Sequence, residues 1–175
     1  IVQAARVSYG KGTRSVSEDR GLLRYLLSHR HTSPIEMAEI KTHIKLPIFV
    51  ARQFIRHRPA NVNEYSGRYS IMNNECYIPQ PELVAIQSTD NKQGRGDRVS
   101  PELAAEVIEI LSQQTDASFK DYDKLLAKDV SRELARIGLS LNTYTEWYWK
   151  IDVNNLINFI RLRLDGHAQY EILPL

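Results

Sequence analysis

The chain has 175 residues, of which 42% are hydrophobic, and this length and composition suit one compact domain with its own core. Lys and Arg number 23 against 21 Asp and Glu, and the resulting net charge of +2 is too small to indicate a nucleic-acid or membrane surface. The lone Cys76 excludes an intramolecular disulfide framework and a cysteine-built metal site, so we expect no bound metal.

The sequence has no run of about 18 consecutive apolar residues and does not open on a signal-peptide pattern. Neither membrane insertion nor export is indicated, and we expect a cytoplasmic protein. Residues 2–9 have the pattern of a secondary-structure element that starts before Ile1. We therefore expect residues 1–175 to form a single domain that a short N-terminal segment precedes.

The first predicted element is a helix with Ser17 as its N-cap, because Leu22, Leu23, Leu26 and Leu27 are spaced as one apolar stripe. The next is a strand. Residues 40–46 alternate between apolar and polar side chains, which is typical of a half-buried strand.

Pro47 suits the first turn of a helix over residues 48–57 that stops near Pro59. Residues 59–67 are rich in Asn and Gly and are predicted to form a loop. The helix therefore delivers its last residues into that loop. Residues 88–98 lack apolar periodicity and indicate a second, exposed connection.

Ser100-Pro101-Glu102 is a strong helix start, and apolar spacing continues to Leu126 in one long helix or two. A shorter helix is predicted over residues 131–137, followed by a strand over residues 141–151. The last helix begins near Asp152. It is apolar on most sides, which indicates burial against neighbours or a partner subunit.

A run of cations or potential cations lies at Arg56, His57 and Arg58. Arginine suits phosphate because its planar fork donates two parallel hydrogen bonds and stays charged at every working pH, so a nucleotide or dinucleotide is a natural partner. A solvated helix end whose cations complement the helix dipole is the commoner explanation of such a run. The following loop offers an acceptor, a hydroxyl and further cations beside a glycine, at Glu64, Tyr65, Ser66, Gly67, Arg68 and Tyr69.

Arg56-His57-Arg58, seven further residues and then Ser66 form a pattern that resembles the signature of the flavin-dependent thymidylate synthases. The resemblance extends through residues 63–70 and is found again at residues 4–10, 31–36, 47–53, 132–136, 141–146 and 167–169. Only residues 70–130 are weakly covered. The pattern is long and specific, and it outweighs the reading as a solvated helix end.

The resemblance implies reductive methylation of dUMP to dTMP, with methylenetetrahydrofolate as carbon donor, NADPH as reductant and FAD as the cofactor that delivers hydride. It also implies a homotetramer with active sites between subunits. Pattern and resemblance together predict an α/β (α+β) domain in which an antiparallel sheet is packed with long helices. No nucleic acid and no membrane is expected among its partners.

Residue roles are likewise implied by the resemblance. Arg163 is expected to be catalytic, hydrogen-bonding the uracil ring and stabilising charge as the ring is activated. The positions that match dUMP-binding residues are Gln53, Arg56, Glu64, Tyr65, Ser66, Gly67, Arg68, Arg136 and Arg163. Those that match FAD contacts are Ser33, Arg56, His57, Arg58, Glu64, Asp152, Asn154 and Asn158. His31 matches an imidazole that helps to stack folate over flavin.

Several of these residues also have ordinary structural explanations. His31 alone would be read as a surface histidine, and Ser33 as a helix N-cap before Pro34. Many relatives carry Asn-x-Arg where this chain has Asp152-Val153-Asn154, and Asp152 could also be an N-cap. If both positions contact flavin in relatives, this chain loses up to two positive charges there, which predicts weaker or rearranged FAD binding.

Two rival functions use the same residues. The first is a nucleic-acid-binding module, in which Arg52, Arg56, Arg58 and Arg68 form a basic surface with Tyr65 and Tyr69. The near-neutral net charge speaks against it. The second is a family member without activity that serves as a structural subunit, and the presence of Ser66, Arg68 and Arg163 speaks against that.

Overall fold

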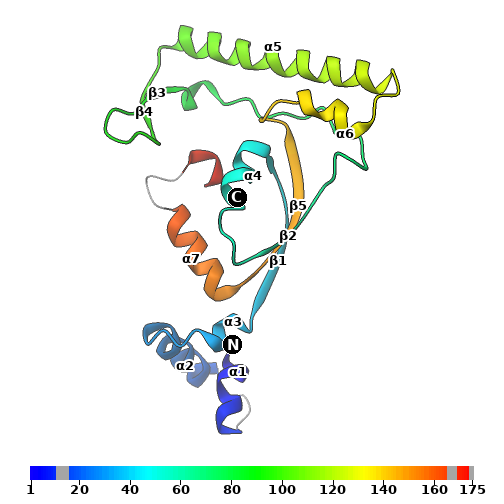
Figure 1. Ribbon diagram of the computed structural model, residues 1–175. Helices are drawn as coiled ribbons and strands as arrows, with labels where there is room; N and C mark the ends of the chain where they lie inside the picture. Colours follow the sequence, from blue (N-terminus) through cyan, green and yellow to red (C-terminus); the bar gives the residue numbers. More distant parts are fainter. Residues whose placement is uncertain (11–15, 165–168, 174–175) are drawn as a thin grey trace.

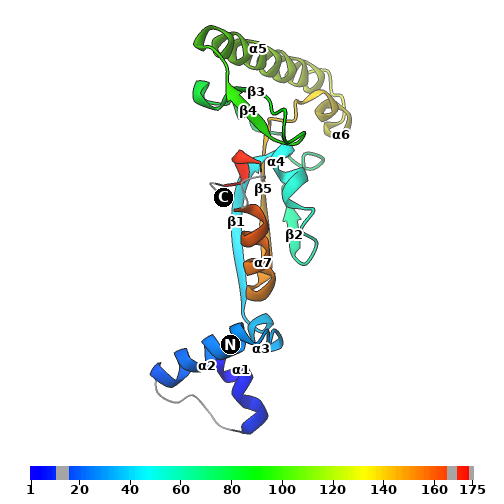
Figure 2. The same ribbon diagram turned by 90° about the vertical axis from the view of Figure 1, so that its left-hand side faces the viewer.

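A computed structural model describes residues 1–10, 16–164 and 169–173. The chain is elongated, with a sheet between a helical N-terminal end and a second helical end (Figures 1 and 2). In chain order its elements are α1 (Val2–Arg6), η1 (Val7–Tyr9), α2 (Val16–Ser28), α3 (Ser33–Glu36), β1 (Glu39–Pro47), α4 (Ile48–Phe54), β2 (Asn61–Glu64), η2 (Pro81–Leu83), β3 (Ala85–Gln87), β4 (Arg95–Arg98), α5 (Pro101–Leu126), α6 (Arg132–Ala135), η3 (Arg136–Gly138), β5 (Tyr144–Asp152), α7 (Val153–Arg163) and η4 (Tyr170–Ile172).

The main sheet is antiparallel, in the order β1-β5-β2. Leu46 of β1 pairs with Thr145 of β5, and Val62 of β2 pairs with Trp149 of β5. The strand predicted over residues 40–46 is confirmed as β1. The strand predicted over residues 141–151 is confirmed as β5, which begins three residues later.

One face of this sheet carries the main core. Trp147, Trp149 and Ile151 alternate along β5 as buried residues, and α4, α7 and η4 cover them. Phe54 of α4 and Phe159 of α7 meet there with ring centroids 4.6 Å apart. The opposite face is polar, so the sheet has the buried and solvated sides that an antiparallel sheet allows.

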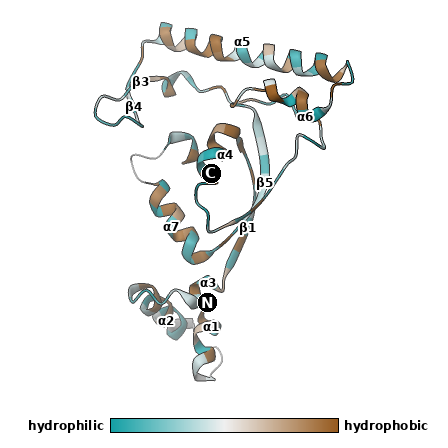
Figure 3. Cartoon of the chain, in the orientation of Figure 1, coloured by the Kyte–Doolittle hydropathy of each residue, from teal (hydrophilic) through white to brown (hydrophobic). Residues whose placement is uncertain are grey.

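A smaller core lies at the end of the molecule formed by α5 and α6. Phe119 and Tyr122 of α5 and Ala135 of α6 are buried together. α5 is one continuous helix, capped at its start by the Ser100 side chain, which accepts a hydrogen bond from the Leu103 backbone. Hydrophilic and hydrophobic residues mix along α5 (Figure 3), and no helix in the described part of the chain is long and apolar enough to cross a membrane.

The predicted loop over residues 59–67 is corrected, because it contains β2. Only one residue of β2, Val62, is apolar, so its own sequence carries little strand signal. The pairing with β5 supplies the hydrogen bonds that make it a strand. The helix predicted over residues 48–57 is also corrected, since α4 ends at Phe54.

The prediction of an irregular connection over residues 88–98 is also corrected. Its last residues form β4, which pairs with β3 in a hairpin, and every residue of β4 is exposed. An exposed two-stranded hairpin has no apolar alternation for a sequence pattern to reveal.

Two predicted caps are also wrong. α2 begins at Val16, so Ser17 lies inside that helix. Thr32 occupies the N-cap position of α3, and Ser33 is its first residue, because the backbone turns helical one residue before Pro34. The helix predicted over residues 131–137 is a short α-helix, α6, continued by the 3-10 turn η3.

Candidate functional site

Arg56, His57 and Arg58 form what we call the cationic turn, which directly follows α4. The backbone N–H of Arg56 donates to Gln53 at 3.2 Å and that of His57 donates to Phe54 at 3.1 Å, so tight turns replace the helix here. Both arginines are exposed, and among the described residues neither guanidinium has a hydrogen bond or ion pair. They are therefore available to an anion.

His57 plays a different part in this turn. It is half-buried, its Nε2 lies 3.2 Å from the Asn155 carbonyl oxygen, and its ring centroid is 5.2 Å from that of Phe159. Both partners belong to α7. His57 thus docks the cationic turn onto α7 while the arginines on either side point to solvent.

Gln53 and Arg163 come together from α4 and α7. The Nη2 group of Arg163 donates to the backbone oxygen of Gln53 at 3.3 Å, and the guanidinium lies 5.8 Å from the Phe159 ring centroid. Within the described residues, Nε of Arg163 and Oε1 of Gln53 are buried without hydrogen-bond partners. Such orphaned groups are rare, and this pair suits a ligand edge that offers both a donor and an acceptor.

Ser66, Gly67 and Arg68 form the serine turn, which follows β2. The backbone N–H of Tyr69 donates to the Ser66 carbonyl at 3.0 Å, and the Arg68 N–H lies 3.4 Å from the Ser66 hydroxyl oxygen. Tyr65 joins this turn to the sheet through an N–H donated to the Glu146 carbonyl at 2.8 Å. These hydrogen bonds hold the Ser66 hydroxyl close to the C-terminal end of β2.

Gly67 is buried against Arg136 of η3. A Cβ at this glycine would lie 2.8 Å from Sδ of Met72 and 3.2 Å from Cδ of Arg136. A side chain at this position would therefore make Met72 and Arg136 shift, and the constraint is this close approach rather than the backbone, since the φ of Gly67 is not positive. Arg136 in turn borders an open hollow of about 720 Å³, together with Glu133 and Ile137.

Two further predicted residues are fixed around the serine turn. Glu64 at the end of β2 accepts a hydrogen bond from the Thr145 hydroxyl at 2.8 Å. Arg68 makes an ion pair with Glu133 of α6, with Nη2 3.3 Å from Oε2, and both side chains are more than half exposed. A pair this exposed contributes little stability, so Arg68 can exchange Glu133 for a more highly charged ligand.

At the start of α7, Asp152 is the N-cap. Its carboxylate accepts from the Asn155 N–H at 2.9 Å and from the Asn155 side-chain amide at 2.7 Å. Partial burial opposes ionisation, but these hydrogen bonds prevail and lower the pKa of Asp152. The amide of Asn154 lies 3.4 Å from Oε1 of Glu36, whereas Asn158 is exposed on the helix surface. Positions 152 and 154 thus bring no positive charge.

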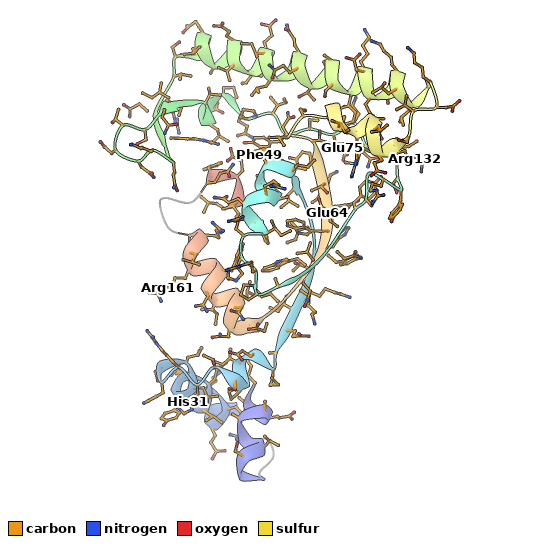
Figure 4. All side chains as sticks on the ribbon, viewed as in Figure 1. His31, Phe49, Glu64, Glu75, Arg132 and Arg161 are labelled. Carbon is orange, nitrogen blue, oxygen red and sulfur yellow. The ribbon has the colours of Figure 1, made fainter. Side chains whose placement is uncertain are left out.

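His31 and Ser33 lie in the N-terminal end of the molecule. Both line a cavity of about 670 Å³ between α1, α2 and α3, and the His31 ring is 5.7 Å from that of Tyr25. Figure 4 shows His31 at the opposite end of the chain from Arg132, which precedes Arg136 on the adjoining helix.

Within one chain the predicted site residues therefore fall into separate groups. Gln53, Arg163 and the cationic turn adjoin α7, and the serine turn adjoins η3. His31 lies with the N-terminal helices, and α3, which carries Ser33, contacts the start of α7 at Asn154. Sequence reasoning missed Glu133 as the partner of Arg68, because 65 residues separate them and no local pattern links them. In the described part of the chain, no group of His, Cys, Asp or Glu residues is placed to hold a metal.

The fold and these groups define an α+β protein in which four separate segments carry the predicted site arginines Arg56 and Arg58, Arg68, Arg136 and Arg163. The chain belongs to the thymidylate synthase complementing protein family, whose family model matches residues 1–175.

Curated relatives carry one shared name, flavin-dependent thymidylate synthase. The chain is 61% identical over 172 residues to the protein of Ehrlichia ruminantium (strain Gardel), with 98% of this chain and 58% of that protein covered. It is 58% identical over 172 residues to the Wolbachia pipientis wMel protein, covering 98% of this chain and 61% of that protein. The chain thus spans about three fifths of the length of these relatives.

A solved structure with the same fold is a UMP/dUMP methylase, PolB from Streptomyces cacaoi, bound with 5-Br UMP. Its TM-score is 0.86 at 31% identity, and the match covers 98% of this chain and 76% of that chain. The same methylase bound with 5-Br dUMP gives a TM-score of 0.84 at 30% identity, covering 98% and 78%. These neighbours support the predicted α+β fold with its antiparallel sheet.

Proposed function

We propose that the protein containing this chain converts dUMP to dTMP by flavin-dependent reductive methylation, with methylenetetrahydrofolate as carbon donor and NADPH as reductant, in the cytoplasm. The observation that carries this proposal is the family match over residues 1–175. The 61% identity to a flavin-dependent thymidylate synthase and the pyrimidine nucleotides bound by PolB support it.

In this proposal Arg163 and Gln53 bind the uracil ring of dUMP. The spare donor on Arg163 and the spare acceptor on Gln53 match the C=O and N–H groups of the ring edge. A permanent guanidinium at this point stabilises negative charge that develops on the ring without changing its own protonation. Ser66, Arg68 and Arg136 hold the nucleotide phosphate and sugar, together with Glu64, Tyr65, Gly67 and Arg56.

The flavin is proposed to lie against the cationic turn. The donor set fits an anionic dinucleotide, because Arg56 and Arg58 are exposed and unpaired within the described residues and His57 fixes the turn on α7. When bound, FAD supplies the hydride that completes the methyl group. Ser33, Glu64, Asp152, Asn154 and Asn158 are its further proposed contacts, and His31 is proposed to stack the folate.

We further propose a homotetramer whose active sites lie between subunits. His31 and the helix α3, which carries Ser33, lie at one end of the chain, and α6, which Arg136 directly follows, lies at the other, so one chain does not bring them together (Figures 1 and 4). Large apolar side chains also remain exposed on α7, where Ile157, Ile160 and Leu162 are more than 40% accessible. A second copy that covers this face would complete both the core and the site.

The direct test is tritium release from dUMP labelled at ring carbon 5, in the presence of methylenetetrahydrofolate and NADPH. We expect a flavin absorbance spectrum from the purified protein and label release that requires both co-substrates. A folded protein that binds no flavin after reconstitution with excess FAD and releases no label would overturn the proposal.

The double variant Asp152→Asn/Asn154→Arg is expected to bind FAD about tenfold more tightly, because it removes one negative charge and adds one positive charge near the proposed flavin site. Asn is a good N-cap, so α7 should remain capped. The measurement is FAD affinity by flavin fluorescence at low and high salt. The gain should shrink as salt screens it, and an unchanged affinity at low salt would refute the charge explanation.

A further inference from the structure

Glu171 on η4 is a buried carboxylate that the proposed reaction does not use. It is 7% exposed and is the only buried acidic residue among residues 1–10, 16–164 and 169–173. Its Oε1 accepts hydrogen bonds from the Tyr77 hydroxyl at 3.1 Å and from Nη2 of Arg95. Three segments that are far apart in sequence therefore meet at one carboxylate.

Two groups of this cluster, Glu171 and Tyr77, have shifted pKa values. Burial opposes ionisation of Glu171, but the hydrogen bond and charge of Arg95 prevail and lower its pKa. Burial and the neighbouring carboxylate raise the pKa of Tyr77 to about 12. At neutral pH the carboxylate is thus an acceptor between two donors.

Arg95 is the anchor of the β3–β4 hairpin. Besides Glu171, its guanidinium donates to the Leu83 carbonyl at 3.3 Å and lies 5.8 Å from the Tyr170 ring centroid. Every residue of β4 is exposed, and a two-stranded hairpin is at best marginally stable by itself. The ion pair therefore links the hairpin and the C-terminal turn, and each holds the other in place.

The C-terminal turn η4 contacts α4, which carries Gln53, and shares a buried core with α7, which carries Arg163. Ile172, next to Glu171, is 4% exposed and belongs to the same core as Phe54 and Phe159. Phe54 directly follows Gln53 on α4, and the Arg163 guanidinium lies over Phe159 on α7. Because Ile172 packs in the core that both helices share, we expect a shift of Ile172 to disturb the Gln53–Arg163 contact.

We propose that Arg95 and Glu171 are positioning residues, which hold η4 so that Ile172 keeps α4 and α7 at the spacing that the Gln53–Arg163 hydrogen bond requires. The mechanical link stands on the packing alone. Its consequence for catalysis rests on the proposed function of Gln53 and Arg163. Glu171 is the buried member of this pair, whereas Arg95 is 40% exposed, so removing Arg95 leaves a buried carboxylate without its compensating charge.

The test compares Arg95→Ala and Glu171→Gln with the control Arg98→Ala, which removes an exposed arginine from the same strand, all in the full chain. In hydrogen exchange, we expect faster exchange at Ile172 and at the last turns of α4 and α7 in Arg95→Ala and in Glu171→Gln, with α5 unchanged. We also expect kcat per folded, flavin-loaded site to fall about 10- to 100-fold, as misplaced catalytic groups do. Arg95→Lys, which keeps the charge, should restore part of this loss.

Faster exchange confined to residues 85–98 would overturn the proposal, as would equal effects from Arg98→Ala. A lower melting temperature with unchanged kcat per folded site would reduce Arg95 and Glu171 to structural residues. If the unaltered protein releases no tritium from labelled dUMP, the proposed function fails instead, and hydrogen exchange alone decides the positioning link.

Discussion

Replacing Arg163 by alanine is expected to lower kcat by about 100- to 1,000-fold, the usual cost of removing one donor that faces developing charge. The side chain is half-buried, contacts Gln53 and leaves Nε free for the substrate. Arg163→Lys should recover little of the loss, because an ammonium cannot reproduce the planar fork. The measurement is single-turnover tritium release from labelled dUMP at saturating substrates.

Arg161→Ala is the matched control for this experiment. Arg161 lies two residues earlier on α7, is exposed, and its guanidinium has no hydrogen bond or ion pair among the described residues. We expect its kcat to stay near that of the unaltered protein. Equal losses in the two variants, or a kcat in Arg163→Ala within threefold of the unaltered enzyme, would remove Arg163 from the catalytic role.

Gly67→Ala is expected to raise the KM for dUMP by about 10- to 100-fold, the equivalent of one lost charge-assisted hydrogen bond. The new methyl group would lie 3.2 Å from Cδ of Arg136 and 2.8 Å from Sδ of Met72, so both side chains must move. Backbone strain is not involved, since the φ of Gly67 is not positive. Isothermal titration with dUMP measures the corresponding loss of binding affinity, and steady-state kinetics measure the KM.

Gly138→Ala provides the control, because this glycine ends the same turn η3 and a Cβ there meets nothing within 4 Å. Its dUMP affinity should be unchanged. Combining Gly67→Ala with Met72→Ala opens space next to the new methyl group and should recover part of the affinity. If Gly67→Ala binds dUMP normally, the contact between Gly67 and Arg136 has no part in substrate binding.

The variants Arg163→Ala and Gly67→Ala separate the proposed catalytic step from the proposed binding of the nucleotide. Arg163 faces the ring, so its loss should act on kcat, whereas Gly67 acts through Arg136 on the part of the nucleotide that does not react. An interaction made only in the transition state lowers kcat, while one made equally with bound substrate changes KM. The opposite pattern in the two variants would mean that their places along the nucleotide are exchanged.

The local sequence pattern was sufficient to predict the helices and strands that have strong apolar periodicity or clear capping residues. The alternation over residues 40–46 predicted β1, and Ser100-Pro101-Glu102 predicted the start of α5. The proposed N-cap at Asp152 is confirmed by its hydrogen bond from Asn155. In each case the signal lies within a few residues, because strand alternation and helix capping are local effects.

By itself the sequence determined the family, through the spacing of Arg56-His57-Arg58 and Ser66, and the main strands and helices. Only the tertiary structure decided the pairing of β2, the approach of Gly67 to Arg136, the Gln53–Arg163 contact and the Arg95–Glu171 ion pair. The last two join residues that are 110 and 76 positions apart. No local pattern encodes such contacts, since they exist only once the sheet and core have brought the segments together.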